Sequence, residues 1–346
     1  MARANISIFI PHMGCPHTCS FCNQHTISRT EKAPSPKKVE EIIAGAYGYM
    51  SEERRRDAEI AFFGGSFTAI DRDYMTALLE KASEFIGEKG FRGIRISTRP
   101  DCIDEEILML LKKYGVTAIE LGAQSMSDKV LEMNERGHTP QDVINAAALI
   151  RSYGFELGLQ MMVGLYGSTE PDEYRTMREF IKINPDTARI YPVCVLKGTK
   201  LAGLYEDGEY QLYPFEKAVN ICGVIYCAFE SAGIRVIRMG LHAEDKVEEN
   251  AVAGFYHPAF AEVVRSDIVK NRVLKYYMSE MSPEDREKQI NIEANKALIG
   301  AVYGHKRSNI TFFGSVGMNV RISENNSLAP DEISINKDVQ NVLKIT

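Results

Sequence analysis

The chain has 346 residues, 45% of them apolar and 25% charged, and acids outnumber bases by 47 to 41 for a formal net charge of -6. This length allows one barrel-sized domain with an appendage. The acidic balance argues against a protein that holds nucleic acid mainly through phosphate contacts, because such proteins usually display basic surface. The sequence has no apolar run long enough to span a membrane, so we expect no membrane partner.

Short apolar strands alternate with amphipathic helices over the first two thirds of the chain, and this alternation predicts a parallel α/β fold. The predicted strands are Ile6 to Ile10, Glu59 to Phe63, Gly93 to Thr98, Ala118 to Leu121, Glu156 to Val163 and Ala188 to Val195. The predicted helices cover residues 36–50, 72–86, 105–113, 140–153 and 171–183. Six strand-helix units fit a partial (β/α)6 barrel, in which ligands gather at the carboxyl ends of the strands.

The pattern changes after Gly240, where we predict a smaller α+β unit with a helix that ends near Tyr277. Its strands are expected near residues 289–293, 309–313 and 319–323. The predicted organisation is a partial barrel over residues 1–240 and a C-terminal α+β cap over residues 241–346, placed so that it closes the open side of the barrel.

Three cysteines lie within eight residues shortly after the first predicted strand. Cys15, Cys19 and Cys22 have the spacing C-x3-C-x2-C. Soft thiolate ligands suit iron-sulfur sites, and three of them can ligate three irons of a four-iron, four-sulfur (4Fe-4S) cluster. The fourth iron then has no cysteine and can bind a substrate, as an open catalytic metal site does.

The main alternative for the triplet is a structural zinc site, in which the three cysteines and one nearby histidine make a Cys3His set. The candidate histidines are His12, His17 and His25. A disulfide is less favoured, because the chain enters its first strand at once without a signal peptide and we therefore expect a reducing cytoplasm. The other four cysteines form no second set of this kind, so we expect no auxiliary cluster.

Glycines and polar residues stand in or directly after the next predicted strands. Gly64 and Gly65 follow the second strand, and paired glycines let the backbone approach a ligand closely. Glu120 and Gln160 lie inside otherwise apolar strands, where a polar group is costly unless it has a partner. A ligand in the barrel lumen would supply that partner. The alternatives are an internal hydrogen-bond network and, for the glycines, plain turn geometry.

The triplet, together with the aromatic Phe21 before its third cysteine, resembles the signature of the radical SAM superfamily. The resemblance implies a radical SAM barrel, a 4Fe-4S cluster held by Cys15, Cys19 and Cys22, and S-adenosylmethionine (SAM) chelated by the open iron. In that superfamily one electron cleaves SAM to methionine and a 5'-deoxyadenosyl radical. It also implies an electron donor such as flavodoxin or ferredoxin.

Longer motifs resemble the radical domain of the catalytic subunit of Elongator over residues 5–245 and, more distantly, oxygen-independent coproporphyrinogen oxidase. They cover residues 63–68, 98–101, 120–125, 134–139 and 191–199. The resemblance implies that Gln124 and Gln160 contact the ribose of SAM and that Arg136 pairs with its carboxylate. The full set of cofactor-binding candidates is Phe21, Gly64, Gly65, Ser66, Ser97, Glu120, Gln124, Arg136, Gln160 and Lys197.

Three residues are candidates for catalytic contact with the substrate, namely Cys194, Tyr191 and His257. Cys194 is a candidate hydrogen donor if it faces the lumen, although isolated cysteines are usually buried apolar fillers. A lone histidine in a turn, such as His257, is more often structural. Arg235 and Arg238, where the chain leaves the barrel, could meet a phosphate or a carboxylate.

The chain departs from the Elongator subunit in two respects. Only four residues precede the first strand, where that subunit has a basic tRNA-binding stretch, and the C-terminal part lacks an acetyl-coenzyme-A loop. We therefore expect a small-molecule substrate, a modified nucleoside, in preference to whole tRNA. Among small radical SAM enzymes of this kind the expectation fits queuosine lyase, which releases queuine from queuosine. The alternatives are an Elongator-like enzyme that modifies the tRNA wobble base, a coproporphyrinogen-oxidase-like radical enzyme and a non-catalytic zinc-binding module.

Overall fold

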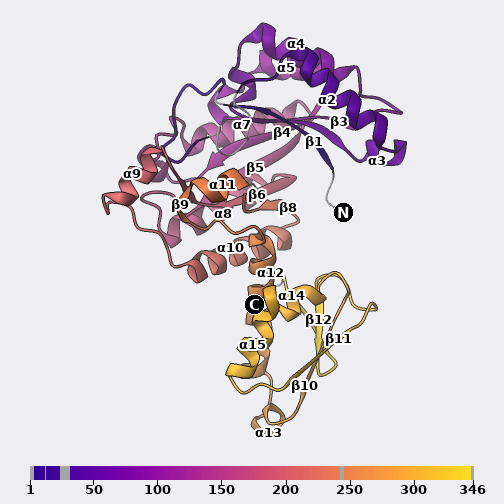
Figure 1. Cartoon of the computed structure of the whole chain (residues 1–346), viewed down its shortest axis with the longest axis vertical. Helices are drawn as coiled ribbons and strands as arrows, with labels where there is room; N and C mark the ends of the chain where they lie inside the picture. The colour runs from indigo at the N-terminus through magenta and orange to yellow at the C-terminus, as the bar shows by residue number, and fades with distance from the viewer. Residues whose placement is uncertain (1–3, 12, 24–31, 242–244, 344–346) are drawn as a thin grey trace.

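Seven parallel strands form one curled sheet in the first two thirds of the chain (Figure 1). The computed structural model describes residues 4–11, 13–23, 32–241 and 245–343. The strands lie in the order β1 (Asn5–Ile10), β2 (Glu59–Gly64), β3 (Gly93–Thr98), β4 (Val116–Gln124), β5 (Glu156–Val163), β6 (Thr187–Pro192) and β8 (Arg235–Met239). All neighbours are parallel. The predicted α/β partial barrel is confirmed, and the structure adds β8 to the six expected strands.

Helices lie along the outer face of this sheet (Figure 1). They are α2 (Pro36–Tyr49), α3 (Glu52–Arg56), α4 (Arg72–Ser83), α5 (Glu105–Lys113), α7 (Pro140–Ser152), α8 (Glu170–Ile183) and α10 (Phe215–Ser231). The Ser35 side chain caps α2 by accepting a hydrogen bond from the Lys38 amide, and Thr139 and Asp142 form a capping box on α7. Because helices cover the sheet, β2 is almost entirely buried, as strands of parallel sheets usually are.

The sixth predicted strand is interrupted, and short helices lie in the connections of the barrel. The predicted strand over residues 188–195 is split at Val193 into β6 and the short β7 (Cys194–Leu196), which pairs with β9 (Ala251–Gly254) in an antiparallel ribbon. Short helices α6 (Asp128–Met133), α9 (Lys200–Glu206) and α11 (Asp245–Asn250) lie in the connections. After β9 the chain continues into the C-terminal unit.

The C-terminal unit is an α+β structure with its own core. It contains α12 (Phe260–Ser279), α13 (Pro283–Arg286), α14 (Ile299–Tyr303) and α15 (Ser308–Ser315). Its sheet has the order β11 (Val320–Glu324), β10 (Ile290–Ala294), β12 (Glu332–Ile335) and β13 (Asp338–Asn341). The strand predicted over residues 309–313 is wrong, because this segment forms α15. Asn309 and Phe313, one helical turn apart, are both buried on the same side of that helix.

The C-terminal unit lies beside α10, not over the mouth of the barrel (Figure 1). Helix α12 packs against α10 and carries residues of both cores, Val264 in the barrel core and Val269 in the C-terminal core. The expected closure of the barrel by this unit is therefore not what the structure shows. A division of the chain between residues 240 and 241 stays a prediction.

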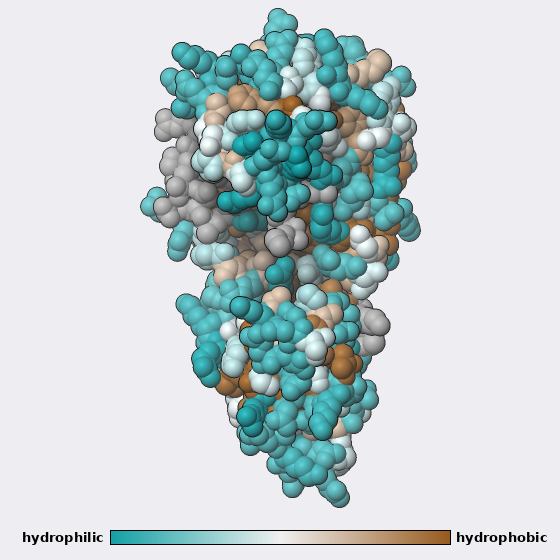
Figure 2. Space-filling view, turned by 90° about the vertical axis from the view of Figure 1, so that its right-hand side faces the viewer, coloured by the Kyte–Doolittle hydropathy of each residue, from teal (hydrophilic) through white to brown (hydrophobic). Residues whose placement is uncertain are grey.

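The surface narrows between the two units and is mainly hydrophilic on the face that Figure 2 shows. Hydrophobic residues are scattered over that face, as they are on ordinary protein surfaces. Among the helices of the described residues, none combines the length and the apolar character needed to cross a lipid bilayer.

Candidate active site

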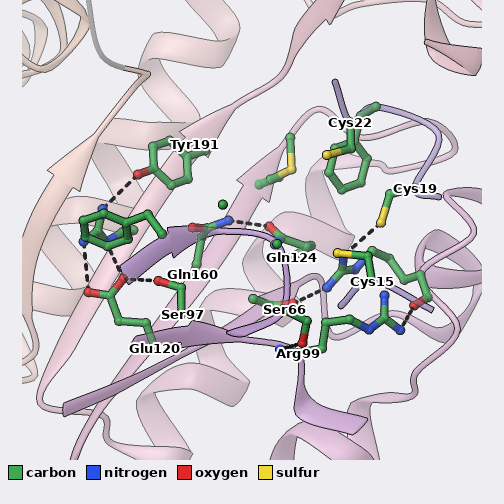
Figure 3. Close-up of a pocket in the computed structure, with 18 of the residues that line it drawn as sticks. Cys15, Cys19, Cys22, Ser66, Ser97, Arg99, Glu120, Gln124, Gln160 and Tyr191 are labelled. Atoms are coloured by element: carbon green, nitrogen blue, oxygen red, sulfur yellow. Dashed lines mark hydrogen bonds and ion pairs between the residues drawn. The ribbon is translucent and has the colours of Figure 1, made fainter. Parts of the chain in front are cut away.

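A cavity of about 420 Å³ opens at the carboxyl ends of the sheet strands, within the usual size of a small-molecule site. It brings together most of the residues that the sequence singles out (Figure 3). Its walls include Cys15, Cys19, Phe21, Cys22, Gly64, Gly65, Ser66, Ser97, Glu120, Gln124, Arg136, Gln160, Tyr191 and Cys194. The predicted convergence of strand-end residues from separate motifs is therefore observed.

The three cysteines of the triplet lie at one end of this cavity (Figure 3). Their loop is held to the barrel by its backbone: the Ser20 amide donates to the Asn134 carbonyl at 3.2 Å, and the Leu201 amide donates to the Ser20 carbonyl at 2.8 Å. The Ser20 hydroxyl adds a buried bond of 2.8 Å to the Asn134 side chain. Segments far apart in the sequence thus position Cys19, which is buried at 7% exposure.

The glycines after β2 are required by the approach of the cysteine loop to that strand. A Cβ atom on Gly65 would lie 1.9 Å from the Met13 carbonyl oxygen, and one on Gly64 would lie 2.5 Å from the Ile10 carbonyl oxygen. Gly14, with φ of 73°, would place a Cβ 2.3 Å from the Ser66 carbonyl oxygen. The turn-geometry interpretation therefore explains why glycine stands here, although Gly64 and Gly65 also line the cavity.

Two buried arginines and a histidine lie under the cysteine end. Arg136 donates through Nη1 to the Cys19 sulfur at 3.0 Å and through Nη2 to the Gly122 carbonyl at 2.6 Å. Its Nε is buried and has no hydrogen-bond partner among the described residues, as is also true of Arg99 Nη1 and His138 Nδ1. Burial and, to a smaller extent, the two guanidinium groups lower the pKa of His138 to about 4. His138 is therefore neutral at pH 7.

This end of the cavity fits a 4Fe-4S cluster. Three soft thiolates share one face of the cavity, and the guanidinium groups beneath them suit an anionic group, such as a cluster with three thiolate ligands. Within the described part of the chain, no three His, Cys, Asp or Glu side chains converge as the ligands of one metal ion would. Of the histidines considered for a zinc site, His17 lines the cavity, and His12 and His25 lie outside the described residues.

Two glutamines occupy the middle of the cavity (Figure 3). Gln160 Nε2 donates to Gln124 Oε1 at 3.2 Å. Gln124 has a φ of 64°, and the register between β4 and β5 shifts between Gly122 and Gln124. A left-handed, bulged residue with a side chain is strained, and such strain gathers at functional sites. Both glutamines line the cavity, and their contact with the ribose of SAM stays a prediction.

The far end of the cavity is a buried ion-pair network. Glu120 accepts hydrogen bonds from Arg95 at 3.2 Å and from Arg189 Nη2 at 3.0 Å, and its other oxygen lies 2.8 Å from Arg189 Nε. The Ser97 hydroxyl also reaches Glu120, at 3.4 Å. Burial opposes the charge on Arg189, but Glu120 outweighs it and raises the pKa of Arg189. Glu120 therefore has no free oxygen for SAM, and the internal-network interpretation fits it better than cofactor binding.

Arg189 also connects this end to Tyr191. Its Nη1 donates to the Tyr191 hydroxyl at 3.2 Å, and its guanidinium carbon lies 4.9 Å from the centre of the Phe63 ring. Arg95 donates hydrogen bonds through Nε to Glu59 and through Nη2 to Glu156, each at 2.8 Å. Sequence reasoning missed Arg95 and Arg189. The signal was present, since each is a charged residue inside an apolar strand, as Glu120 is.

Two predicted site residues lie elsewhere. Lys197 is bonded to the backbone of the α11–β9 connection, its Nζ donating to the Glu249 carbonyl at 3.1 Å and its amide to the Asn250 carbonyl at 2.9 Å. The His257 ring packs edge-on against His305 at 5.0 Å, at the junction with the C-terminal unit. Neither belongs to the residues that line the cavity. The structure therefore places Lys197 and His257 outside the cavity lining, and their roles in cofactor binding and catalysis stay predictions.

A third residue that sequence reasoning missed supports the barrel mouth. Glu173 on α8 is buried and accepts hydrogen bonds from the Gly164 amide and the Ser168 hydroxyl, both at 2.8 Å. Burial raises its pKa to about 7, against the two hydrogen bonds, which lower it. Tyr213 donates to the Ser168 carbonyl of the same loop at 3.3 Å. This carboxyl fixes the loop after β5, next to the cavity.

Comparisons with known proteins agree with the fold and the site. Residues 9–181 match the model of the Radical SAM superfamily, and residues 185–270 match that of the Radical_SAM C-terminal domain. The chain is 31% identical over 183 residues to the tRNA uridine(34) acetyltransferase of Methanocaldococcus jannaschii, covering 47% of this chain and 34% of that protein. It is 27% identical over 316 residues to Elongator complex protein 3 of Homo sapiens, covering 76% of this chain and 56% of that protein.

A solved structure has the same fold. The archaeal Methanocaldococcus infernus Elp3 with an N-terminal deletion superposes with a TM-score of 0.62 at 21% identity, over 82% of this chain and 69% of that one. The chain spans about a third of the length of the curated acetyltransferase, 34%.

The match to the superfamily model and the three cysteines at the cavity end define the class of protein. The chain belongs to the radical SAM superfamily and is an enzyme. Its cofactors, as a member of that superfamily, are a 4Fe-4S cluster, which Cys15, Cys19 and Cys22 would hold, and SAM. Its relatives include the radical domains of Elongator-type proteins.

Proposed function

We propose that this enzyme cleaves SAM reductively in the cavity and that the resulting radical abstracts a hydrogen atom from a modified nucleoside, with queuosine as the first candidate and release of queuine as the outcome. The observation that carries the proposal is the arrangement of one continuous cavity. Cluster cysteines line one end, two glutamines occupy the middle, and Tyr191, Cys194 and an arginine line the remainder. In this order the substrate would lie beside SAM at the end of the cavity away from the cysteines.

The cluster, once reduced, supplies the electron that splits SAM into methionine and a 5'-deoxyadenosyl radical. The residues of the chain position the reactants. Gln124 and Gln160 offer amide groups to the ribose of SAM. Phe9 and Phe63, with ring centres 6.0 Å apart, give the cavity aromatic surface against which a base can pack.

Cys194 is our candidate hydrogen donor to the substrate radical. It is buried at 5% exposure and lines the cavity on β7. Burial raises the pKa of Cys194 to about 12, so its sulfur keeps the hydrogen that a donor must supply. Transfer of that hydrogen atom would leave a thiyl radical, which an electron and a proton, the electron coming from a flavodoxin or ferredoxin, would return to the thiol.

The choice of a nucleoside as the substrate class rests on the net charge of the chain. The chain is acidic overall, with a net charge of -6, which favours a nucleoside over a whole tRNA. We place the reaction in the cytoplasm, because cysteines that ligate a cluster must be kept from forming disulfides, as a reducing compartment does.

The test is anaerobic incubation of the reconstituted enzyme with SAM, a reductant and queuosine, with the products identified by mass spectrometry. We expect queuine and 5'-deoxyadenosine in the wild-type reaction and neither with a Cys19→Ala variant. Queuine serves as a control substrate. Unchanged queuosine beside abundant 5'-deoxyadenosine, or consumption of queuine itself, would sink the lyase proposal.

A second candidate is modification of the tRNA wobble base. The identity of 31% with a curated tRNA uridine(34) acetyltransferase favours it. This function needs a basic face that holds tRNA, and such binding weakens steeply as the salt concentration rises. A salt titration of tRNA binding distinguishes the two candidates, because the nucleoside proposal predicts no salt-dependent tRNA complex.

A further inference from the structure

Arg238 is a half-buried cation that the proposed reaction has not used. It lies on β8, and its Cα is the register partner of the Cα of Arg189 on β6. Register partners on neighbouring strands point to the same face of a sheet. Since Arg189 lines the cavity, Arg238 lies on the same face of the sheet one strand further along, next to the cavity and not among the residues that line it.

Arg189 and Arg238 lie on neighbouring strands, and Arg238 has no carboxylate partner of its own among the described residues. Arg238 donates through Nε to the Gly240 carbonyl at 2.9 Å, and within the described residues no carboxylate forms an ion pair with it. Burial lowers the pKa of Arg238, and the positive charge of Arg189 lowers it further, against the opposing effect of Tyr191. An arginine held beside another arginine is a costly arrangement unless an anion joins them.

The carboxylate that pairs with Arg189 already has a second arginine partner. Glu120 is shared between Arg95 and Arg189. The other two acids of the network, Glu59 and Glu156, lie around Arg95. Among the described residues, Arg189 and Arg238 thus share one carboxylate on their part of the sheet, and the surplus negative charge of the network lies around Arg95.

Arg189, Arg238 and the Tyr191 hydroxyl still have hydrogen-bond donors that an anion could use. A guanidinium has five N–H donors, and Arg189 uses two of its own, one on Tyr191 and one on Glu120, while its Nε makes no hydrogen bond among the described residues. The Tyr191 hydroxyl accepts its hydrogen bond from Arg189 and so keeps its own hydrogen to donate. In Figure 3 the Tyr191 and Glu120 side chains lie on the opposite side of Gln124 from the three cysteines, so this end is separate from the cluster.

We propose that Arg238, Arg189 and the Tyr191 hydroxyl form a subsite for a phosphoryl group, so that the enzyme binds and consumes the phosphate ester of the nucleoside in preference to the free nucleoside. This inference rests on the proposed nucleoside substrate, whose ordinary anionic forms are phosphate esters. The guanidinium fork matches phosphate oxygens in a bidentate manner, and a phosphate monoester carries close to two negative charges at pH 7.

The first test uses inorganic phosphate as the probe. Calorimetric titration of the cluster-loaded protein with SAM present and no reductant gives its dissociation constant. We expect Arg238→Gln to weaken phosphate binding by about tenfold or more, as loss of a charge-assisted contact should. Arg235→Gln is the matched control, because Arg235 lies on the same strand but is exposed and pairs with Glu156 at 3.7 Å. It should leave binding unchanged.

Three outcomes would overturn the subsite. The first is that the wild-type protein does not bind phosphate. The second is that the wild type and Arg238→Gln bind phosphate equally, which marks an adventitious ion only. The third is that acetate binds as tightly as phosphate. A second experiment compares turnover of queuosine and of its 5'-phosphate. If the wild type binds phosphate through Arg238 but consumes neither compound, the lyase proposal fails and the subsite stands. If it consumes both equally and Arg238→Gln changes nothing, the subsite fails and the lyase proposal stands.

Discussion

Replacing Arg136 with glutamine should lower the reduction potential of the cluster. In the structure Arg136 Nη1 donates to the sulfur of Cys19 at 3.0 Å, in a buried setting. A cation at this position stabilises the more negative, reduced state of a cluster bound through that sulfur. Loss of the guanidinium therefore makes the cluster harder to reduce.

The magnitude follows from the hydrogen bond. A bond to a charged group contributes about 1.5–3 kcal/mol. In a one-electron couple a tenfold change in equilibrium, about 1.4 kcal/mol, corresponds to 59 mV. If the bond acts mainly on the reduced state, Arg136→Gln lowers the midpoint potential by about 60–130 mV.

The assay is a redox titration of the reconstituted protein followed by electron paramagnetic resonance. Arg136→Lys keeps the positive charge and should shift the potential less. Arg178→Gln, an exposed change on α8, controls for net charge. An unchanged midpoint potential together with weaker SAM binding would refute this reasoning and return Arg136 to the carboxylate contact that the family resemblance implies.

Three further changes test the support of the site. Gly65→Ala would place a Cβ 1.9 Å from the Met13 carbonyl oxygen and should reduce iron retention and melting temperature, whereas Gly45→Ala, in open space on α2, should not. Because burial raises the pKa of Glu173 from 4.5 to about 7, its folded state holds the proton more tightly. Stability against urea should therefore fall as the pH rises from 4.5 towards 7, by at most about 3 kcal/mol, and Glu173→Gln should flatten that slope. Arg95→Met leaves buried carboxylates uncompensated and should cost about 3–5 kcal/mol in urea unfolding; a loss below about 1 kcal/mol would contradict the network described here.

Local patterns were enough to predict the barrel and the cysteine end of the site. Strand periodicity located six of the seven barrel strands, and the spacing of Cys15, Cys19 and Cys22 pointed to the cluster before any fold was known. β8 was missed because Arg235 and Arg238 interrupt its apolar pattern. The charges of a strand that lines a polar lumen do not follow the burial rule on which periodicity relies.

The remaining errors arise from tertiary packing. Residues 309–313 have strand-like composition but form part of α15, because Asn309 bonds the Ser266 and Ala301 carbonyls and Phe313 fills the second core. His257 was placed near the substrate because the C-terminal unit was expected over the barrel mouth. Sequence gives the existence of such a unit but not the face against which it packs.

The most direct test of the account is the iron and zinc content of anaerobically purified protein, measured beside Cys19→Ala and the matched variant Cys102→Ala. The account predicts about four irons per chain in the wild type, loss of iron in Cys19→Ala, and full iron in Cys102→Ala, since Cys102 lies outside the triplet. Stoichiometric zinc without iron in the wild-type protein would contradict it.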